Sequence, residues 1–404
     1  MLVPLLLLLL SSLVPRLAAE IGDESEGRRL ANILADAKEN RLGKKRQRLQ
    51  RLLKHIDDSI KLPAMLKPEP WCKAPNTKGN VIIAAAMSVD WGRRDAELFF
   101  RSLRNTGYKE DVVVPIMVGS SSSLIETLKE YDAIAYAVKT TCDSHNHFEM
   151  KCTFDEFPTE PFSVNMMRYY LYKWLAAMYS SDSIIMISDF RDVLFQSNPF
   201  NYRPQEWKGN ASYPRFVAFQ EAFPNRVIYR CPFNGGWIRA CYGEEALGLV
   251  GGNTVSCSGV SIGTRDAIVA YSHLILQQLK PEVRWGKGTK RTNGGCTSTG
   301  MDQGFHNWLV FSGALDRFMD IKVYQQGEGP VNTVGSFFPG PAAILKFPLE
   351  QWRVLRGEGN QKAFYNWNGD ISPVVHQMDR FYRTEFKGNY GEHLKFADGI
   401  KGVA

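Results

Sequence analysis

Apolar and polar residues follow two alternating patterns along the chain beyond Gly79. Short runs rich in Val, Ile and Ala predict buried strands at 80–86, 112–118, 133–138 and 183–188. Between the runs, apolar residues recur at helical spacing and predict helices at 93–105, 124–131 and 166–179. Strands that alternate with helices are typical of a parallel sheet. The pattern therefore predicts the α/β class, with a Rossmann-like, mostly parallel sheet flanked by helices.

The segment before Gly79 has a different composition. Residues 20–62 are rich in Arg, Lys, Leu, Glu and Ala, and an apolar stripe that includes Leu49 and Ile56 predicts a helical stem. The stripe either packs on the main domain or pairs with a second chain. Prolines between 63 and 75 end the helix. The predicted units are a leader at 1–19, the helical stem and Pro-rich linker at 20–78, and the main domain at 79–404.

The leader has the layout of a secretory signal. A Leu-rich run is followed by Arg16 and the small pair Ala18-Ala19. The run is shorter than the about 20 residues that span a bilayer. We expect a signal peptide, with an uncleaved signal-anchor as the alternative. Either places the protein in the secretory pathway, in the ER or Golgi lumen or outside the cell.

The cysteines favour structural disulfides over a zinc site, because Cys-x-x-Cys spacing is absent. Cys142 with Cys152, and Cys231 with Cys241, are close enough in sequence to close small loops, although the pairing stays open. Asn210 begins the only glycosylation sequon and predicts a surface loop.

The formal net charge of +7 is concentrated in a basic stretch between Lys44 and Lys54. A secretory leader argues against a nucleic-acid partner for this charge. The basic stretch is therefore either a solvated helix face or a contact for acidic lipid, glycan or protein.

Two acids follow the predicted strand at 183–188, in the run Asp189-Phe190-Arg191-Asp192. Open parallel sheets bind ligands just outside the carboxyl ends of their strands. Two carboxylates there can hold one hard cation, Mn²⁺ or Mg²⁺, which binds the diphosphate of a nucleotide. We favour Asp192 as the direct ligand, with Asp189 contacting a ribose or a metal-bound water. In the structural alternative, Asp189 caps a turn and Asp192 pairs with Arg191.

Three later motifs also carry candidate chemistry. The run 257–264 is predicted to be a small-residue loop, in which Ser258 and Gly259 let a ligand approach the backbone. Asp302-Gln303 begins an amphipathic segment, where the carboxylate either caps a helix or serves a reaction centre as base or electrostatic stabiliser. His376 follows an apolar strand, and its neutral imidazole would complete a metal site with the two acids.

In this order, the motifs resemble those of the GT-A superfamily of nucleotide-sugar-dependent glycosyltransferases, over residues 80–383. The resemblance implies that Asp189 and Asp192 bind metal and diphosphate, and that His376 completes the metal coordination. It also implies that Ser258-Gly259 contacts the donor sugar and that Asp302, followed by Gln303, lies at the reaction centre.

Within the superfamily, the chain resembles the glycogenin-like family 8. The segment 302–307 is similar to the Asp-Gln-x-x-x-Asn segment of that family, and 102–108 to the end of its first helix. Arg168 falls where those enzymes carry a donor-contacting arginine. The chain departs from them in placing two residues between its acids instead of one, and in lacking a lysine segment after His376.

These observations predict an enzyme, a metal-dependent glycosyltransferase that moves a hexosyl or pentosyl group from a nucleotide-sugar to a glycan, protein or other acceptor. The unusual spacing of the acids leaves open a catalytically inactive, carbohydrate-binding protein of the same fold. A glycoside hydrolase that uses Asp189 and Asp302 is the third hypothesis, and it would need neither nucleotide nor metal.

Overall fold

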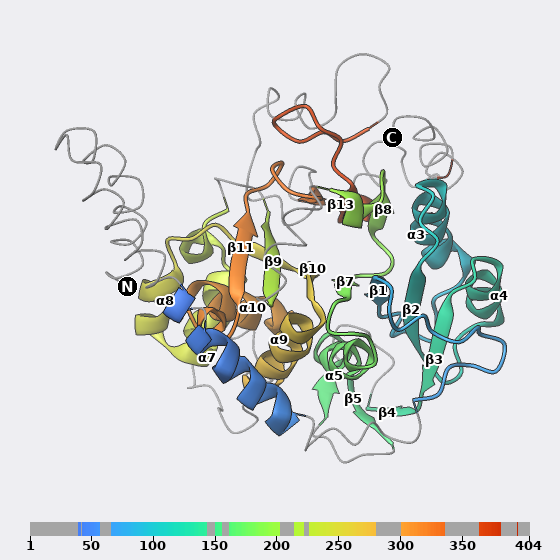
Figure 1. Cartoon of the computed structure of the whole chain (residues 1–404), viewed down its shortest axis with the longest axis horizontal. Helices are drawn as coiled ribbons and strands as arrows, with labels where there is room; N and C mark the ends of the chain where they lie inside the picture. The colour runs from blue at the N-terminus through green and yellow to red at the C-terminus, as the bar shows by residue number, and fades with distance from the viewer. Residues whose placement is uncertain are drawn as a thin grey trace.

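The computed structural model describes residues 39–41, 43–56, 66–143, 150–155, 161–202, 214–221, 226–279, 300–335, 363–380 and 394. A seven-stranded sheet forms the centre of the molecule, in the order β11-β9-β10-β7-β1-β2-β3 (Figure 1). Strand β10 runs antiparallel to both of its neighbours, and the other strand pairs of this sheet are parallel. The predicted α/β class with a mostly parallel sheet is confirmed.

The elements of this core follow the predicted order. The central strands are β1 (Val81–Ala84), β2 (Asp111–Met117), β3 (Ile134–Val138), β7 (Ile184–Ser188), β9 (Arg215–Gln220), β10 (Ser256–Thr264) and β11 (Asp320–Tyr324). The helices are α3 (Arg93–Asn105), α4 (Ser122–Glu130), α5 (Val164–Ala177), α7 (Asn234–Tyr242), α8 (Glu244–Val250), α9 (Arg265–Gln277) and α10 (Met301–Phe311). Short 3-10 turns occur at η1 (Pro199–Asn201), η2 (Ile228–Arg230) and η4 (Leu315–Arg317).

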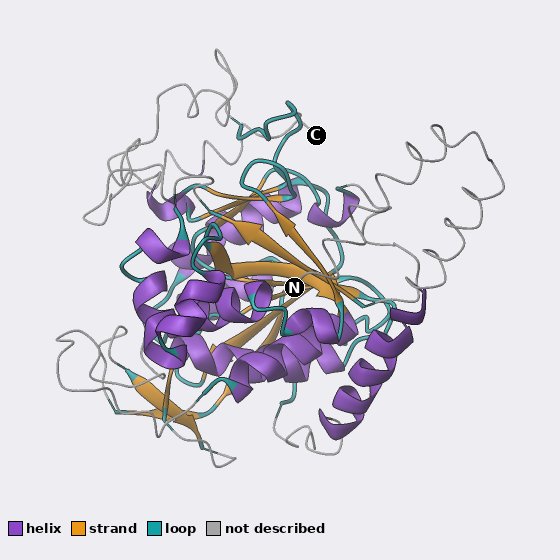
Figure 2. Ribbon diagram, turned by 90° about the vertical axis from the view of Figure 1, so that its left-hand side faces the viewer, coloured by secondary structure: helices purple, strands orange, loops and turns teal. Residues whose placement is uncertain are grey.

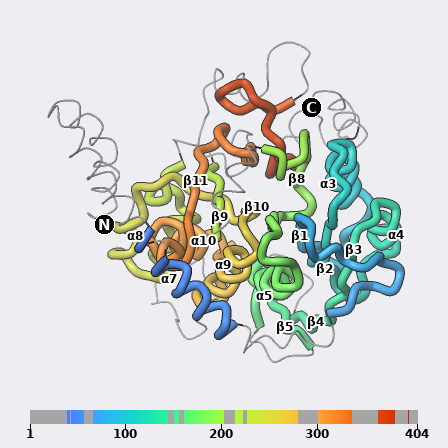
Figure 3. Tube along the Cα trace, viewed as in Figure 1, coloured from blue at the N-terminus to red at the C-terminus, as the bar shows by residue number. Residues whose placement is uncertain are grey.

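Two apolar cores lie on the two faces of the sheet. Alternate residues of β1 enter different cores, Val81 and Ile83 on one face and Ile82 and Ala84 on the other. Helices α5, α9 and α10 cover the first face, and α3 and α4 cover the second. Figure 2 shows helices packed around the strands of the central sheet. Strands buried on both faces need apolar side chains at every position, which explains the continuous Val-Ile-Ile-Ala run of β1. Helices α5 and α9, far apart in sequence, pack side by side (Figure 3).

A three-stranded sheet continues from the end of β7. It contains β8 (Val193–Phe195), β12 (Val331–Thr333) and β13 (Val374–His376), in the order β12-β13-β8. Strand β8 follows β7 after four residues of turn, and β13 pairs with it in antiparallel register, so that His376 lies opposite Val193. This pairing brings the C-terminal part of the described chain to the carboxyl end of β7.

A third sheet carries a disulfide. It contains β4 (Thr140–Cys142), β5 (Lys151–Phe154) and β6 (Phe162–Ser163). Cys142 is bonded to Cys152 across the β4–β5 pair, which is one of the two pairings that the sequence left open. The other pairing that the sequence left open, Cys231 with Cys241, does not form, because Cys231 is a free buried thiol and Cys241 belongs to another disulfide. Most of α7 lies between these two cysteines. At about 1.5 Å per residue it separates them beyond the about 7 Å that a disulfide spans.

The predicted loop at 257–264 is instead part of strand β10, which is buried along nearly its whole length. Its small residues have a packing role. At Gly263, a methyl group would lie 2.6 Å from the carbonyl oxygen of Arg215 on the neighbouring strand β9. Small side chains therefore let β10 pack closely against the neighbouring strand β9. Because small residues are also common in loops, the sequence pattern predicts a loop here.

The N-terminal helix, residues 39–41 and 43–56 of the described chain, packs on the main domain. Leu49 is 2% and Ile56 0% exposed, and both belong to the core that α5, α9 and α10 cover. Lys45 Nζ lies 2.8 Å from Asp316 Oδ1 and 3.3 Å from the carbonyl oxygen of Met319. Of the two expectations for the apolar stripe, packing on the main domain is confirmed for Leu49 and Ile56.

The leader at 1–19 and the sequon at Asn210 lie outside the described residues. Among the described helices, none has the length and apolar character of a membrane span.

Candidate active site

The turn after β7 carries the two aspartates, Asp189 and Asp192. Its second residue, Phe190, is buried and fixes the position of the turn. Phe190 is 1% exposed and packs against the ring of Trp91 and the aromatic residues of α3. The Asp189 N–H donates to the carbonyl oxygen of Gly259 on β10 at 2.6 Å. Arg191 reaches Asp379 at 3.8 Å, so the alternative in which it pairs with Asp192 is not what the structure has.

Asp189, Asp192 and His376 form a cluster with the donor set of a metal site. One ligand atom from each residue lies within 4.8 Å of the others. His376 Nε2 is 3.2 Å from Asp189 Oδ2 and 3.9 Å from Asp192 Oδ1. The β8–β13 pairing causes this arrangement, since it sets His376 beside the strand that Asp192 precedes. The structure thus brings together the three residues that the sequence analysis proposed as metal ligands.

The two carboxylates of the cluster differ in pKa. Burial raises the pKa of Asp192 to about 6, and the neighbouring Asp189 adds to the rise. Burial also acts to raise the pKa of Asp189, but the Arg168 guanidinium and His376 outweigh it and lower that pKa to about 2. A divalent cation would offset the repulsion between the two carboxylates, and carboxylate oxygens with one imidazole suit Mn²⁺ or Mg²⁺.

Gly259 keeps the space beside the cluster clear. A methyl group at this position would lie 2.5 Å from Asp189 Oδ2 and 2.6 Å from His376 Nε2, too close for a real side chain. Only glycine therefore fits next to these ligand atoms. The donor set of two carboxylates and one imidazole fits a divalent cation.

Two polar side chains contact the His376 ring on the side away from the carboxylates. Its Nδ1 faces Cys257 Sγ at 3.6 Å and Thr333 Oγ1 at 3.4 Å, while Nε2 faces the carboxylates. With the proton on Nδ1, the Nε2 lone pair points at the position where a cation would bind. Sequence reasoning missed Cys257 and Thr333, because only the pairing of β12 with β13 and the path of β10 bring them to this ring.

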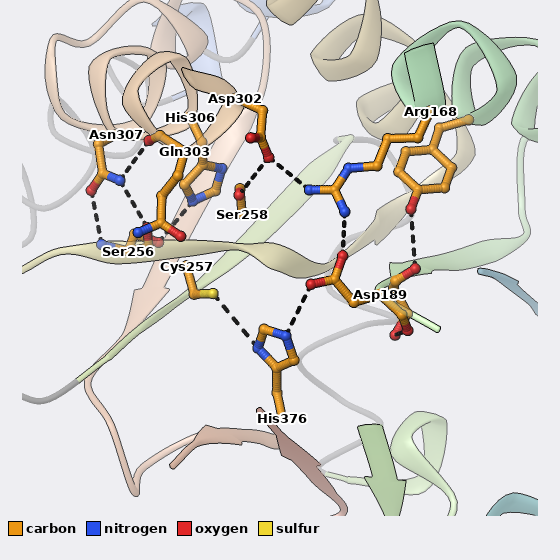
Figure 4. Close-up of polar contacts among 12 residues, drawn as sticks. Arg168, Asp189, Ser256, Cys257, Ser258, Asp302, Gln303, His306, Asn307 and His376 are labelled. Carbon is orange, nitrogen blue, oxygen red and sulfur yellow. Dashed lines mark hydrogen bonds and ion pairs between the residues drawn. The ribbon is translucent and has the colours of Figure 1, made fainter. Parts of the chain in front are cut away.

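Arg168 joins the metal cluster to Asp302 (Figure 4). Its guanidinium, on α5, pairs with Asp189 Oδ1 through one nitrogen and with Asp302 Oδ2 at 2.7 Å through the other. Ser258 Oγ donates to the same Asp302 oxygen at 2.9 Å. Asp302 lies in the first turn of α10, but its side chain is 4% exposed and directed to these partners instead of capping the helix.

Gln303 is placed differently from its neighbour. Its Nε2 donates to Glu221 Oε1 at 3.1 Å and to Asn234 Oδ1 at 3.3 Å. Asn307, one turn later, accepts from the N–H of Ser256 and donates to its carbonyl oxygen, both at 2.8 Å. These two hydrogen bonds to the backbone of β10 hold α10 against the sheet. They thereby also hold Asp302 and Gln303 in place.

His306 lies behind Asp302, where burial lowers the pKa of its imidazole to about 3. Tyr271 OH lies 2.7 Å from its Nδ1, and Ser256 Oγ 2.8 Å from its Nε2. The unfolded chain binds this proton near pH 6.5 and the folded chain only near pH 3. Neutral His306 therefore makes its full contribution to the free energy of unfolding above about pH 6.5. Below that pH, the free energy of unfolding falls by about 1.4 kcal/mol per pH unit.

We expect His306→Gln to flatten this acid dependence of the free energy of unfolding by about 1 kcal/mol between pH 7 and pH 5.5. Urea unfolding at the two pH values measures it. Tyr271→Phe is the control, because it removes a hydrogen bond but no imidazole, and it should lower stability at both pH values while keeping the slope. A wild-type slope in His306→Gln contradicts the assignment.

Comparison with protein-family models gives no match for the chain, and comparison with curated proteins gives none either. Among solved structures, it is similar to the galactosyltransferase LgtC in complex with donor and acceptor sugar analogues. Identity is 13%, coverage is 80% of this chain and 97% of that one, and the TM-score is 0.38. It is also similar to the bifunctional glycosyltransferase WbbM, at 11% identity, 81% and 51% coverage and a TM-score of 0.43.

A third similar structure is glucosyl-3-phosphoglycerate synthase from Mycobacterium tuberculosis, in complex with Mn²⁺, UDP and phosphoglyceric acid. Identity is 12%, coverage is 62% of this chain and 69% of that one, and the TM-score is 0.30. Two of these three structures, LgtC and WbbM, are described as a galactosyltransferase and a bifunctional glycosyltransferase. With TM-scores below 0.5, the likenesses carry no argument about function. The functional argument therefore rests on the site itself.

Proposed function

We propose that the protein is a metal-dependent glycosyltransferase that transfers a sugar from a nucleotide-sugar to a glycan, protein or other acceptor. The observation that carries the proposal is the juxtaposition of two groups at the carboxyl edge of the sheet. The cluster Asp189, Asp192 and His376 fits a divalent cation, and Arg168 links it directly to the buried Asp302. Transfer from a nucleotide-sugar needs a cation site for the diphosphate next to a polar site for the sugar.

The residues that would hold the cation are Asp189, Asp192 and His376. Asp189 has Oδ1 engaged by Arg168 and turns Oδ2 toward His376, so that Oδ2 is the oxygen that would ligate a cation. A bound Mn²⁺ or Mg²⁺ supplies neutralisation of the charge that develops on the departing nucleoside diphosphate. We retain Asp192 as the favoured direct ligand.

The chain's own residues bind and orient the sugar. Arg168 has a fixed direction because two carboxylates hold its guanidinium, and it places positive charge between the cluster and Asp302. Asp302 keeps one oxygen occupied by Arg168 and Ser258, which leaves the other to accept a sugar hydroxyl or to stabilise positive charge at the anomeric carbon. Gly259 lets Asp189 and His376 lie against β10, and Ser258 holds Asp302 in place by a hydrogen bond.

A location in the ER or Golgi lumen, or outside the cell, is part of the proposal and rests on the predicted leader. The disulfide between Cys142 and Cys152 supports an oxidising compartment.

The test is isothermal titration of the wild-type chain with UDP and with GDP, each with and without Mn²⁺, followed by a screen for release of the nucleoside diphosphate from the corresponding nucleotide-sugars. We expect Mn²⁺-dependent binding and measurable release. Absence of binding to every nucleotide would overturn the proposal. Binding without any release would favour the inactive carbohydrate-binding protein, and glycan cleavage in chelator without nucleotide would favour the hydrolase.

A further inference from the structure

The N-terminal helix has two faces with different surroundings. On its inner face, Arg41 and Lys45 each reach Asp316 at 2.8 Å. On its outer face, four basic side chains are exposed and recur at helical spacing. We call them the basic stripe: Lys44, Arg48, Arg51 and His55. At about 1.5 Å of helix axis per residue, the basic stripe is about 16 Å long.

The elements packed around the basic stripe contain few acids. Among the described residues of the N-terminal helix, the acid is Glu39, at the end of the helix opposite to His55. Helix α5 contains no acid, and the acid of α9, Asp266, pairs with Arg265 at 2.9 Å. The Lys and Arg residues of the basic stripe make no ion pair within the described part of the chain. The outer face therefore carries positive charge that no neighbouring acid balances.

Helix α5 adds a recessed ammonium group to this surface. Lys173 is 8% exposed, and its Nζ lies 5.6 Å and 5.7 Å from the ring centroids of Tyr170 and Trp174. It makes no hydrogen bond or ion pair with any residue that the structure describes. Burial lowers the pKa of Lys173 to about 8, because a buried charge loses its hydration. An anion beside Nζ would offset this loss.

His273, on α9, connects Lys173 to the basic stripe. Burial lowers the pKa of His273 to about 4, and the charges of Lys173 and His55 add to the lowering, so the three side chains lie near one another. All three helices also pack into one apolar core. Gln277 Nε2 lies 2.9 Å from His273 Nε2. With this amide as donor, the neutral imidazole carries its proton on Nδ1, from which it can donate to an anion.

The shape of this surface suits a linear anionic polymer better than a membrane. The apolar side of the N-terminal helix is buried in the core, where Leu49 is 2% and Ile56 0% exposed, so no apolar face is left to enter lipid. A flat layer of headgroups would reach the basic stripe but not the recessed Lys173. A chain of acidic sugars can lie along the stripe, direct one charge to Lys173, and stack a ring on the half-buried Tyr170.

We infer that the N-terminal helix, α5 and α9 form a binding surface for an acidic polysaccharide, whose sulfate or carboxylate groups pair with the basic stripe and with Lys173. The surface is separate from the candidate active site. Arg168 is directed to Asp189 and Asp302, whereas Lys173 leaves α5 about 140° around the helix from Arg168. The inference therefore goes beyond the proposed sugar transfer and does not depend on it.

The first experiment measures the Kd of the wild-type chain for a heparin octasaccharide, which carries sulfates and carboxylates, and for a hyaluronan octasaccharide, which carries carboxylates alone. We expect binding by isothermal titration that weakens as the salt concentration rises. Binding of heparin alone would identify sulfate as the group that is bound, and binding of both would identify carboxylate as sufficient.

Two triple variants locate the binding. In Lys44→Gln/Arg48→Gln/Arg51→Gln, the Kd for the heparin octasaccharide should rise on the order of 10-fold, since exposed ion pairs contribute little individually. The matched control is Lys78→Gln/Lys109→Gln/Lys139→Gln. It removes the same charge from three exposed lysines outside these helices, and it should bind as wild type.

Exchange of Lys173 for methionine tests the recessed part of the surface. The variant keeps the apolar stem but loses a charged donor, and its Kd for heparin should rise about 10- to 100-fold. Because burial opposes the ionised form of Lys173, the variant should unfold at the same or a higher urea concentration than wild type. Lost binding would then not be lost folding. Lys173→Arg keeps the charge and should restore binding at least in part.

Four results would overturn the inference. They are absence of binding of both octasaccharides to wild type, equal Kd values in the two triple variants, a wild-type Kd in Lys173→Met, and binding to vesicles of phosphatidylcholine and phosphatidylserine in place of heparin. The last result would assign the basic stripe to a membrane. The Kd for UDP with Mn²⁺ should stay at the wild-type value in every variant, so that the proposed function and this inference are tested separately.

Discussion

Exchange of Asp192 for asparagine is expected to lower the turnover of sugar transfer on the order of 1,000-fold. A bound cation supplies several kcal/mol of charge stabilisation to a departing diphosphate, and each about 1.4 kcal/mol corresponds to a tenfold rate. Asparagine keeps the shape of Asp192 but not its charge, and it weakens the cluster with Asp189 and His376. The measurements are turnover at saturating donor and the Kd for Mn²⁺.

The stability of the same variant should change in the opposite direction. Ionised Asp192 opposes folding at pH 7, because its pKa in the folded chain, about 6, lies above the ordinary value of a carboxyl group. Without metal, Asp192→Asn should therefore unfold at the same or a higher urea concentration than wild type. With Mn²⁺, wild type should gain stability and the variant should gain little.

Asp182→Asn is the control for this experiment, since Asp182 is exposed and lies just before β7, at the end of the strand opposite to Asp189. It should behave as wild type in turnover and Mn²⁺ binding. Full turnover in Asp192→Asn would contradict the assignment of Asp192 as a metal ligand. If a chelator then lowered the turnover of Asp192→Asn and of wild type equally, Asp189 and His376 would be sufficient to bind the metal.

Exchange of Arg168 for methionine is expected to lower the free energy of unfolding by about 3–5 kcal/mol and to abolish transfer. Arg168 pairs with Asp189 and Asp302, and the side chain of Asp302 is only 4% exposed. Removing the guanidinium leaves two carboxylates without their common partner, and a buried unpaired charge is costly. Urea unfolding and donor binding measure the two effects.

A second change tests the cause of this loss. In the double variant Arg168→Met with Asp302→Asn, one of the stranded charges is gone, and part of the lost stability should return while transfer stays abolished. Arg239→Met breaks an exposed pair with Glu244 and should cost no more than about 1 kcal/mol. If the double variant is as unstable as Arg168→Met, the loss comes from packing instead of charge.

The sequence predicts the central elements well because their patterns are local. Helix α3 spans residues 93–105 as predicted, and the strands of the first half overlap their predicted ranges. The prediction of a loop at 257–264 is wrong, because Gly and Ser are typical of loops. In this protein they are small so that β7, β9 and His376 can pack closely against β10. Composition cannot show this packing, since these neighbours are far away in sequence.

The candidate site divides in the same way. Asp189, Asp192, Asp302 and His376 could be proposed from residue type and position after apolar runs, and the structure brings them together. Glu221 could not be proposed, because it follows β9 with no recognisable motif and its contact with Gln303 depends on how α10 docks. Carboxylates that face a site through tertiary packing alone leave no local signal.

The packing of the N-terminal helix alters where the folding unit of this protein begins. Leu49 shares a core with Leu315 and Met319, and Lys45 holds Asp316 beside them. A recombinant fragment cut at Gly79, the start of the predicted main domain, would expose this apolar surface to solvent and gain an aggregation-prone patch. We therefore expect a stable fragment to include residues 39–56, whose apolar side chains belong to the same core as those of the main domain.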